Sequence, residues 1–181
     1  MSKTPTTIAT PPGWGGILDA GEAIIWQGRP DGRFRFGWRD LVTGLFGFIF
    51  AGFALVWMVI AASAGGFFWA FGLIHFSVGA AIAVGGPVWR TYRLRHTWYT
   101  LTTRRAFIAT DTLTSGRSLS AYPIAADTVL TLEGEDPASV HFASVMRRIN
   151  KRDRLVPIGF EHIHDAGEVL EKLREIQKAA R

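Results

Sequence analysis

The chain has 181 residues, with 20 Lys and Arg against 15 Asp and Glu, and it contains no cysteine. The lack of cysteine excludes disulfides and thiolate metal sites. Much of the net charge of +5 comes from arginines that flank a long apolar stretch, where an anionic membrane surface explains them better than nucleic acid does. We therefore expect membrane lipids, and not nucleic acid, as partners.

The N-terminal residues 1–20 are rich in Thr, Pro and Gly and lack the apolar core of a signal peptide, which predicts a flexible tail. In the following segment, residues 21–40, the run Glu22–Gly28 ("EAIIWQG") has the composition of a short strand, and "RPDG" ends it with a turn. One sequence does not tell whether this strand joins a later sheet.

The apolar stretch Leu41–Trp89 has 49 residues and no Asp, Glu, Lys or Arg. About 20 residues suffice to cross a bilayer as a helix, so the stretch fits two crossings. The small residues "ASAGG" mark the turn, which predicts transmembrane helices over residues 41–62 and 67–89 joined by an external turn at 63–66. A hairpin buried in a soluble core is the alternative, but a chain of this length has too little protein to cover it.

Arginines precede the first predicted helix and follow the second, whereas the connecting turn has no charge. The positive-inside rule then places both termini in the cytoplasm, as expected for a multi-pass membrane protein.

His75 is an ionisable residue in the second predicted helix, and we expect it near the middle of the span. Such residues in a membrane often have a function, so a proton relay or haem ligation in a transport or redox subunit is one interpretation. A hydrogen bond to a backbone or hydroxyl group of the first helix is the other, and the absence of a second ionisable residue favours it. Gly79 and a ladder formed by Ser77, Ala81 and Gly85 would let this helix approach a partner closely, including a second copy of the chain.

From Thr97 onward the pattern changes to short runs rich in β-branched and aromatic residues. Turn signals separate these runs at roughly ten-residue intervals, as in antiparallel sandwiches and barrels. We predict such a β domain over residues 97–181, with strands at residues 97–102, 105–110, 117–124, 128–133, 139–145 and 154–160.

The C-terminal segment has the pattern of an amphipathic helix. Asp165 is the expected N-cap, and Glu168 three residues later resembles the partner of a capping box. Glu168 and Lys172 have the spacing of a helical ion pair. One apolar stripe, which we expect to close the sheet, is formed by Val169, Leu170, Leu173 and Ile176.

Three segments resemble the bacterial pleckstrin-homology-like (PH-like) domain membrane protein family. "YTLTTRRAFI" carries a Y-x-L-T-x-x-R signature as Tyr99, Leu101, Thr102 and Arg105. "EAIIWQGRP" and "IGFEHIHDAGEVLEKL" resemble the family's N-terminal segment and its closing strand and helix. The resemblance implies an α+β protein of the bacterial inner membrane, with a two-helix transmembrane hairpin and a cytoplasmic PH-like domain. It also implies a binding scaffold, and it favours a turn-stabilising role for Arg104.

The segment "RRINKRDR", residues 147–154, has five basic residues and one acidic residue. We expect a loop there, with Arg147, Arg148, Lys151 and Arg152 as candidate lipid-binding residues that each contribute about 1 kcal/mol near an anionic surface. The alternative is a solvated hairpin loop whose charges only keep the domain soluble.

No nucleophile elbow, phosphate loop or paired-carboxylate pattern occurs, so we expect neither an enzyme nor a cofactor. "HIHD", residues 162–165, offers two histidines separated by one residue, which do not define a metal site. The leading interpretation is a membrane-anchored interaction module that binds a protein partner or itself. The alternatives are an anionic-lipid sensor acting through residues 147–154 and a transport or redox subunit using His75.

Overall fold

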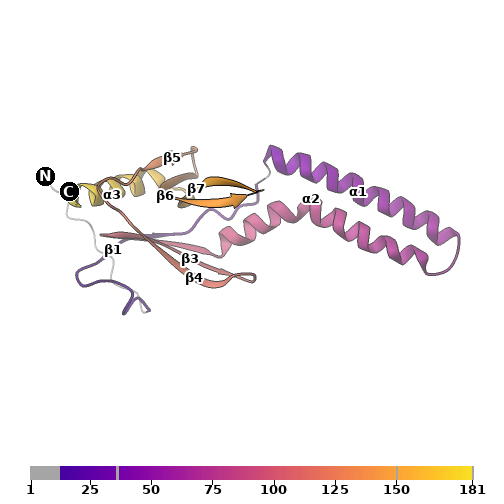
Figure 1. The fold of residues 1–181 in the computed structure, drawn as a ribbon, viewed down its shortest axis with the longest axis horizontal. Helices are drawn as coiled ribbons and strands as arrows, with labels where there is room; N and C mark the ends of the chain where they lie inside the picture. The colour runs from indigo at the N-terminus through magenta and orange to yellow at the C-terminus, as the bar shows by residue number, and fades with distance from the viewer. Residues whose placement is uncertain (1–12, 36, 150, 181) are drawn as a thin grey trace. The chain divides into compact units, whose positions relative to one another are not determined.

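The computed structural model describes residues 13–35, 37–149 and 151–180. The chain divides into two compact units, one formed by residues 32–93 and the other by the two segments that flank them. Its elements (Figure 1) are β1 (Ile24–Gly28), α1 (Trp38–Ser63), the 3-10 helix η1 (Phe68–Phe71), α2 (Gly72–Arg95), β2 (Thr97–Thr102), β3 (Arg105–Thr112), β4 (Gly116–Pro123), β5 (Thr131–Glu133), β6 (Ala138–Ile149), β7 (Arg152–Ile163) and α3 (Ala166–Ala179). The predicted α+β class with antiparallel sheets is confirmed.

The helical unit consists of α1 and α2, and both are long and apolar enough to cross a membrane. Their limits differ from the predicted spans. Helix α1 begins at Trp38 and not at Leu41, while η1 precedes α2, which continues through Pro87 to Arg95. The apolar pattern ends at Trp89, but arginine is a good helix former, so the backbone ladder continues past it.

Two glycines allow the backbones of α1 and α2 to meet. A Cβ atom added to Gly79 would lie 2.7 Å from the backbone nitrogen of Ala51. A Cβ atom added to Gly47 would lie 2.7 Å from the carbonyl oxygen of Gly79 and closer still to Ala83. Small residues at a helix crossing permit this approach, so the close contact predicted for Gly79 is found within the hairpin itself.

The predicted ladder of Ser77, Ala81 and Gly85 is not part of this contact. Ser77 and Ala81 are exposed, and no atom lies within 4 Å of a Cβ atom added to Gly85. These residues are two positions away from Gly79 and Ala83, which is more than half a helical turn. The ladder therefore faces away from α1.

A charged group joins α1 and α2 at the end opposite their connection. The guanidinium of Arg90 donates to Asp40 Oδ2 at 2.8 Å and to the carbonyl oxygen of Arg35 at 2.5 Å. Asp40 Oδ2 also accepts from the backbone nitrogen of Gly37 at 2.8 Å, at the first turn of α1. Asp40 thus fixes the start of one helix and binds the far end of the other.

The other unit contains two antiparallel sheets, with the orders β1-β2-β3-β4 and β5-β6-β7. Strand β1 pairs with β2, with Gln27 opposite Thr100 and Gly28 opposite Tyr99. The question left open by the sequence is therefore answered, because the Glu22–Gly28 segment supplies an edge strand of the main sheet. This sheet is built from segments on both sides of the helical hairpin in the sequence.

The core of this unit is centred on Phe160 of β7, which is fully buried. Its ring centroid lies 4.8 Å from that of Tyr99, 5.0 Å from that of Phe142 and 5.2 Å from that of Trp26. Both sheets thus contribute aromatic rings to one core. Helix α3 closes it with the predicted apolar stripe, of which Val169, Leu173 and Ile176 are buried and Leu170 is partly buried.

The start of α3 differs from the predicted capping box. Asp165 is the N-cap residue, but its side chain makes no capping hydrogen bond. Its Oδ2 atom instead accepts from the indole Nε1 of Trp26 at 2.7 Å. A buried indole N–H needs a partner, and the carboxylate provides one across 139 residues of sequence. The predicted ion pair of Glu168 with Lys172 forms at 3.3 Å.

The loop predicted over residues 147–154 is mostly strand. Strand β6 continues to Ile149 and β7 begins at Arg152, so Arg147, Arg148 and Arg154 are paired in the ladder. Lys151 has φ 61°, as a tight hairpin turn requires, while its neighbour Asn150 lies outside the described residues. Arginine signals strand weakly, but a tight turn brings the two strands together and lets the pairing continue to the turn.

Candidate functional site

Four residues of the Y-x-L-T-x-x-R signature lie at the β2–β3 turn or just before it. Tyr99 is buried, and its hydroxyl accepts from the backbone nitrogen of Glu161 at 3.1 Å, which ties β2 to β7. Leu101 is fully buried in the core. Thr102 Oγ1 accepts from the backbone nitrogen of Arg105 at 2.9 Å and stabilises the turn. The signature therefore builds the fold.

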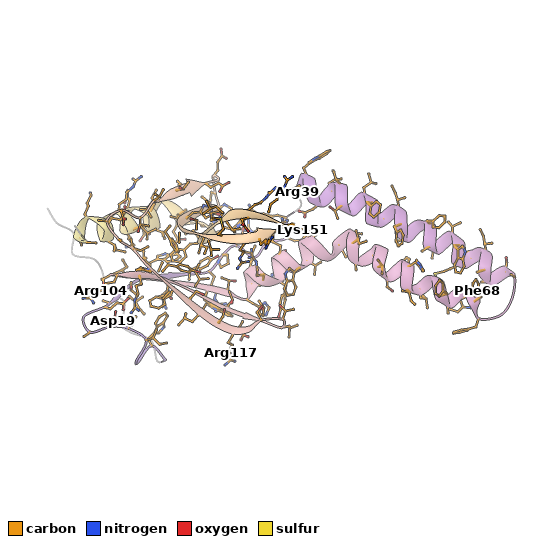
Figure 2. All side chains as sticks on the ribbon, in the orientation of Figure 1. Asp19, Arg39, Phe68, Arg104, Arg117 and Lys151 are labelled. Atoms are coloured by element: carbon orange, nitrogen blue, oxygen red, sulfur yellow. The ribbon has the colours of Figure 1, made fainter. Side chains whose placement is uncertain are left out.

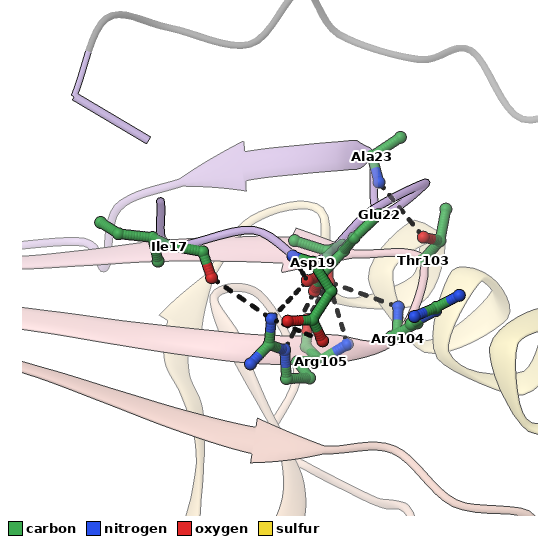
Figure 3. A network of polar contacts seen from close by, with 8 residues as sticks. Ile17, Asp19, Glu22, Ala23, Thr103, Arg104 and Arg105 are labelled. Atoms are coloured by element: carbon green, nitrogen blue, oxygen red, sulfur yellow. Dashed lines mark hydrogen bonds and ion pairs between the residues drawn. The ribbon is translucent and has the colours of Figure 1, made fainter. Parts of the chain in front are cut away.

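Arg105 forms a buried ion pair with Glu22, a partner that the sequence analysis did not identify (Figure 3). Its guanidinium binds both carboxylate oxygens of Glu22, with Nε donating to Oε1 at 3.1 Å and Nη2 donating to Oε2. Thr102 Oγ1 also donates to Oε1 at 2.6 Å. The Glu22 side chain is 0% exposed, so these donors replace the water that burial removes.

Arg104 contributes to the turn through its backbone, and the side chain that binds Glu22 is that of its neighbour Arg105. Only the backbone of Arg104 contributes, since its nitrogen donates to Thr102 Oγ1 at 3.3 Å and its carbonyl oxygen accepts from Ile124 at 3.0 Å. Its side chain is exposed. Neighbouring positions at a turn point to different sides, and the sequence does not show which of the two arginines faces the buried carboxylate.

The pKa of Glu22 follows from these contacts. Burial raises the pKa, but the hydrogen bonds from Arg105 and Thr102 and the positive charge of Arg105 outweigh this effect and lower it from 4.5 to about 2. The same pairing raises the pKa of Arg105. Since the folded pKa of Glu22 is depressed, its contribution to stability is present at neutral pH and is lost as the pH falls from about 5 through 2.

Arg105 also holds part of the segment that the sequence predicts to be a flexible tail. Its Nη2 atom donates to the carbonyl oxygen of Ile17 at 3.3 Å and lies 3.2 Å from Asp19 Oδ2. The indole of Trp14 packs edge-on against Phe107, with 5.2 Å between the ring centroids. Residues 14–19 are therefore fastened to the sheet, whereas residues 1–12 lie outside the described part of the chain.

The four candidate lipid-binding residues are brought together on the β6–β7 hairpin, whose turn carries Lys151 (Figure 2). Arg147 lies directly opposite Arg154, and Arg148 lies opposite Asp153. All of these side chains are exposed. Like charges in a cross-strand pair repel each other, so a nearby anion would stabilise the Arg147–Arg154 pair.

The next two cross-strand pairs, counted away from the turn, are apolar. Met146 pairs with Leu155 across the hairpin, and the two are 65% and 66% exposed. Val145, which is 38% exposed, pairs with Val156 on the face that carries Arg147 and Arg154. We name the exposed residues 145–148 and 151–155 the hairpin arm. It combines an apolar base with a cationic end, as surfaces that bind at a lipid interface do.

His75 lies in the first turn of α2, and its ring faces Phe50, in the middle of α1, with 6.3 Å between the centroids. Its predicted hydrogen bond to the first helix does not form; Nδ1 instead contacts the carbonyl oxygen of Phe71, one turn earlier in its own segment, at 3.4 Å. Helix α2 begins at Gly72 and not at Phe67, because η1 occupies residues 68–71. The signature residues and the candidate lipid-binding residues all belong to the other compact unit.

In the "HIHD" segment, the imidazole of His164 lies near two carboxylates from other parts of the chain. His164 Nδ1 lies 2.7 Å from Asp136 Oδ1, and its Nε2 lies 3.9 Å from Asp31 Oδ2. His162 has φ 52°, and its backbone carbonyl oxygen accepts from Asp31 at 2.7 Å. No three potential metal ligands converge in the part of the chain that the structure describes.

No family model, curated protein or solved structure matches this chain. Its function must therefore be inferred from its own residues and their arrangement.

Proposed function

We propose that this chain is a membrane-anchored PH-like interaction module, held in a bacterial inner membrane by α1 and α2 with both termini in the cytoplasm. The module binds and does not catalyse. Its interaction surface is the hairpin arm, which contacts the anionic lipid of the inner leaflet.

The pairing of β1 with β2 supports the proposed topology. The chain leaves the sheet after Gly28, passes through α1 and α2, and returns at Thr97, next to the strand it left. Strands paired in one sheet lie on one side of a membrane, so the intervening segment must cross it an even number of times. Two helices of sufficient length satisfy this requirement, and the arginines on both flanks favour the cytoplasmic side.

The arrangement of the strands supports the PH-like assignment. A four-stranded and a three-stranded antiparallel sheet share one core, and a C-terminal amphipathic helix closes it. This is the organisation implied by the resemblance of the signature residues. The Trp26–Asp165 hydrogen bond and the Tyr99–Glu161 hydrogen bond join segments that are distant in sequence into this one unit.

The Arg147–Arg154 cross-strand pair is the observation that carries the lipid function. A repulsive pair at an exposed hairpin end gains from a negatively charged surface, and each basic residue near such a surface contributes about 1 kcal/mol. Met146 and Leu155 form the neighbouring cross-strand pair, and their exposed side chains can enter the headgroup region. The membrane anchor confines the arm to the same surface, so weak contacts suffice.

A single cysteine placed at Met146 tests this contact, because the chain has none of its own. With an environment-sensitive fluorophore on that cysteine, the full chain in nanodiscs of anionic lipid should show blue-shifted emission that reverts as salt is raised. Nanodiscs of zwitterionic lipid should not give the shift.

The matched control is a cysteine at Glu171, an exposed position of α3, whose label should not respond to lipid charge. Neutralising Arg147, Arg148, Lys151 and Arg152 to Gln should abolish the response at Met146. Equal emission in both kinds of nanodisc would contradict the lipid function.

The second candidate is binding of a protein partner, including a second copy of the chain. Among the residues that the structure describes, strand β4 ends its sheet and has a strand neighbour on one side only, so its eight residues offer an edge for an added strand. A photo-crosslinking residue at Leu119, in the middle of β4, should then give a discrete protein adduct in native membranes. The same residue at exposed Glu171 is the control, and adducts with lipid alone at Leu119 would exclude this candidate.

A further inference from the structure

The helical unit has a hollow of about 290 Å³ between α1 and the start of α2. Its walls are aromatic, formed by Phe50, Phe53, Trp57 and Phe71. Two small buried residues, Ala54 of α1 and Gly72 of α2, also line it and leave the space that larger side chains would fill. A hollow of this size holds a single ring system, near the lower limit for small-molecule sites.

His75 supplies the imidazole of this hollow, and Trp57 adds an indole. The His75 ring lies 5.2 Å from Phe71 and 6.3 Å from Phe50 between centroids. Because a carbonyl oxygen only accepts, the 3.4 Å contact with Phe71 requires the proton of a neutral imidazole to be on Nδ1. In that tautomer Nε2 is an acceptor, so a molecule in the hollow would satisfy it by donating a hydrogen bond.

We propose that the hollow binds the ring of a hydroxylated, prenylated ring lipid, specifically a lipid quinol, whose hydroxyl donates to His75 Nε2. Aromatic walls favour a flat ring, which can stack or meet them edge-on. Phe53 and Phe71 of its lining are exposed, so a prenyl tail can leave the hollow.

The same geometry disfavours a phospholipid acyl chain and the oxidised quinone. An acyl chain fills apolar space but leaves Nε2 without a partner, and an unsatisfied polar group in hydrocarbon is costly. A quinone has two carbonyl acceptors and no donor, so it would need the tautomer protonated on Nε2, which gives up the contact of Nδ1 with Phe71. We therefore expect this site to bind the quinol more tightly than the quinone.

The inference rests on the proposed membrane anchoring, so the test uses the full chain in nanodiscs and scores its incorporation separately. A short-chain prenylated benzoquinol, kept reduced under anaerobic conditions, is titrated into loaded and empty nanodiscs, and bound ligand is quantified after separation. We expect saturable binding of about one quinol per chain above the partitioning into empty discs. The corresponding quinone should bind about tenfold more weakly, as the loss of one hydrogen bond implies.

Three variants localise the site. Ala54→Phe fills the hollow and should abolish saturable binding, whereas Leu55→Phe adds the same bulk at the next, lipid-exposed position and should preserve it. His75→Phe removes the acceptor and should give equal affinity for quinol and quinone.

Chains that enter the nanodiscs but bind quinol no better than Ala54→Phe overturn this proposal and leave the anchoring intact. Equal affinity of the unaltered chain for quinol and quinone overturns it as well. Failure of the chain to enter the nanodiscs overturns both proposals.

Discussion

Replacing Arg105 with Met is expected to lower the free energy of unfolding of the sheet-containing unit by about 3 kcal/mol. The substitution keeps an unbranched apolar stem but removes the guanidinium that binds Glu22, whose side chain is 0% exposed. Breaking a buried ion pair by removing one partner leaves an uncompensated charge, which costs more than the pair itself contributes. The segment around Ile17 also loses its hydrogen bond to Arg105.

The measurement is the urea midpoint of the full chain in detergent, determined by pulse proteolysis at neutral pH. Arg104→Met is the matched control, because Arg104 is adjacent but exposed, and its midpoint should stay within about 0.5 kcal/mol of the unaltered chain. A cost at Arg104 equal to that at Arg105 would contradict the assignment of the buried ion pair.

The pH dependence gives a second readout of the same prediction. In the unaltered chain the Glu22 carboxylate has a pKa of about 2, so it stays charged in the fold down to low pH. Without Arg105, Glu22 loses a hydrogen bond and a positive charge that lower its pKa, so the pKa rises and the fold binds a proton at higher pH. The difference between the two chains should therefore be largest above about pH 5 and shrink as the pH falls toward 2.

The second large effect is expected at the crossing of α1 and α2. Gly79→Ala places a methyl group 2.7 Å from the backbone nitrogen of Ala51 and 2.9 Å from its Cβ atom, so the helices must separate. Backbone atoms cannot rotate away as a side chain does, and overpacking of this kind costs about 1–3 kcal/mol. Gly47→Ala, on the facing helix, meets the backbone of Ala83 and should have a similar effect.

Each of these variants has a control on the same helix. No atom lies within 4 Å of a Cβ atom added to Gly85 of α2 or to Gly52 of α1. Gly85→Ala and Gly52→Ala should therefore leave stability unchanged or raise it slightly, since Ala is the better helix former. Unfolding of the purified chain in mixed micelles of increasing sodium dodecyl sulfate measures the difference. Equal stability of all four variants would contradict the close crossing.

Features set by neighbouring residues were predictable from the sequence. The absence of charge over residues 41–89 indicated two long helices, and the spacing of Val169, Leu173 and Ile176 indicated the buried side of α3. Both patterns arise from the geometry of a single helix. No knowledge of a distant partner is needed to read them.

Features set by distant residues were not predictable. Glu22 binds an arginine 83 residues away, and Asp165 binds an indole instead of capping its helix. The one available signal was the carboxylate of Glu22 directly before an apolar strand, where burial demands a cation. The strand character of Arg147 and Arg148 depends on pairing with β7 in the same way, because local propensity does not encode a cross-strand partner.

The pairing of β1 with β2 also has a consequence for the biogenesis of the protein. At a synthesis rate of about 5–20 residues per second, β1 waits several seconds on the ribosome before β2 emerges. If only one helix inserted, the two strands would be left on opposite sides of the bilayer, with Ile24 and Trp26 of β1 uncovered. In the proposed topology, a chain with one inserted helix therefore cannot complete the sheet, and its exposed apolar strand is open to proteolytic quality control.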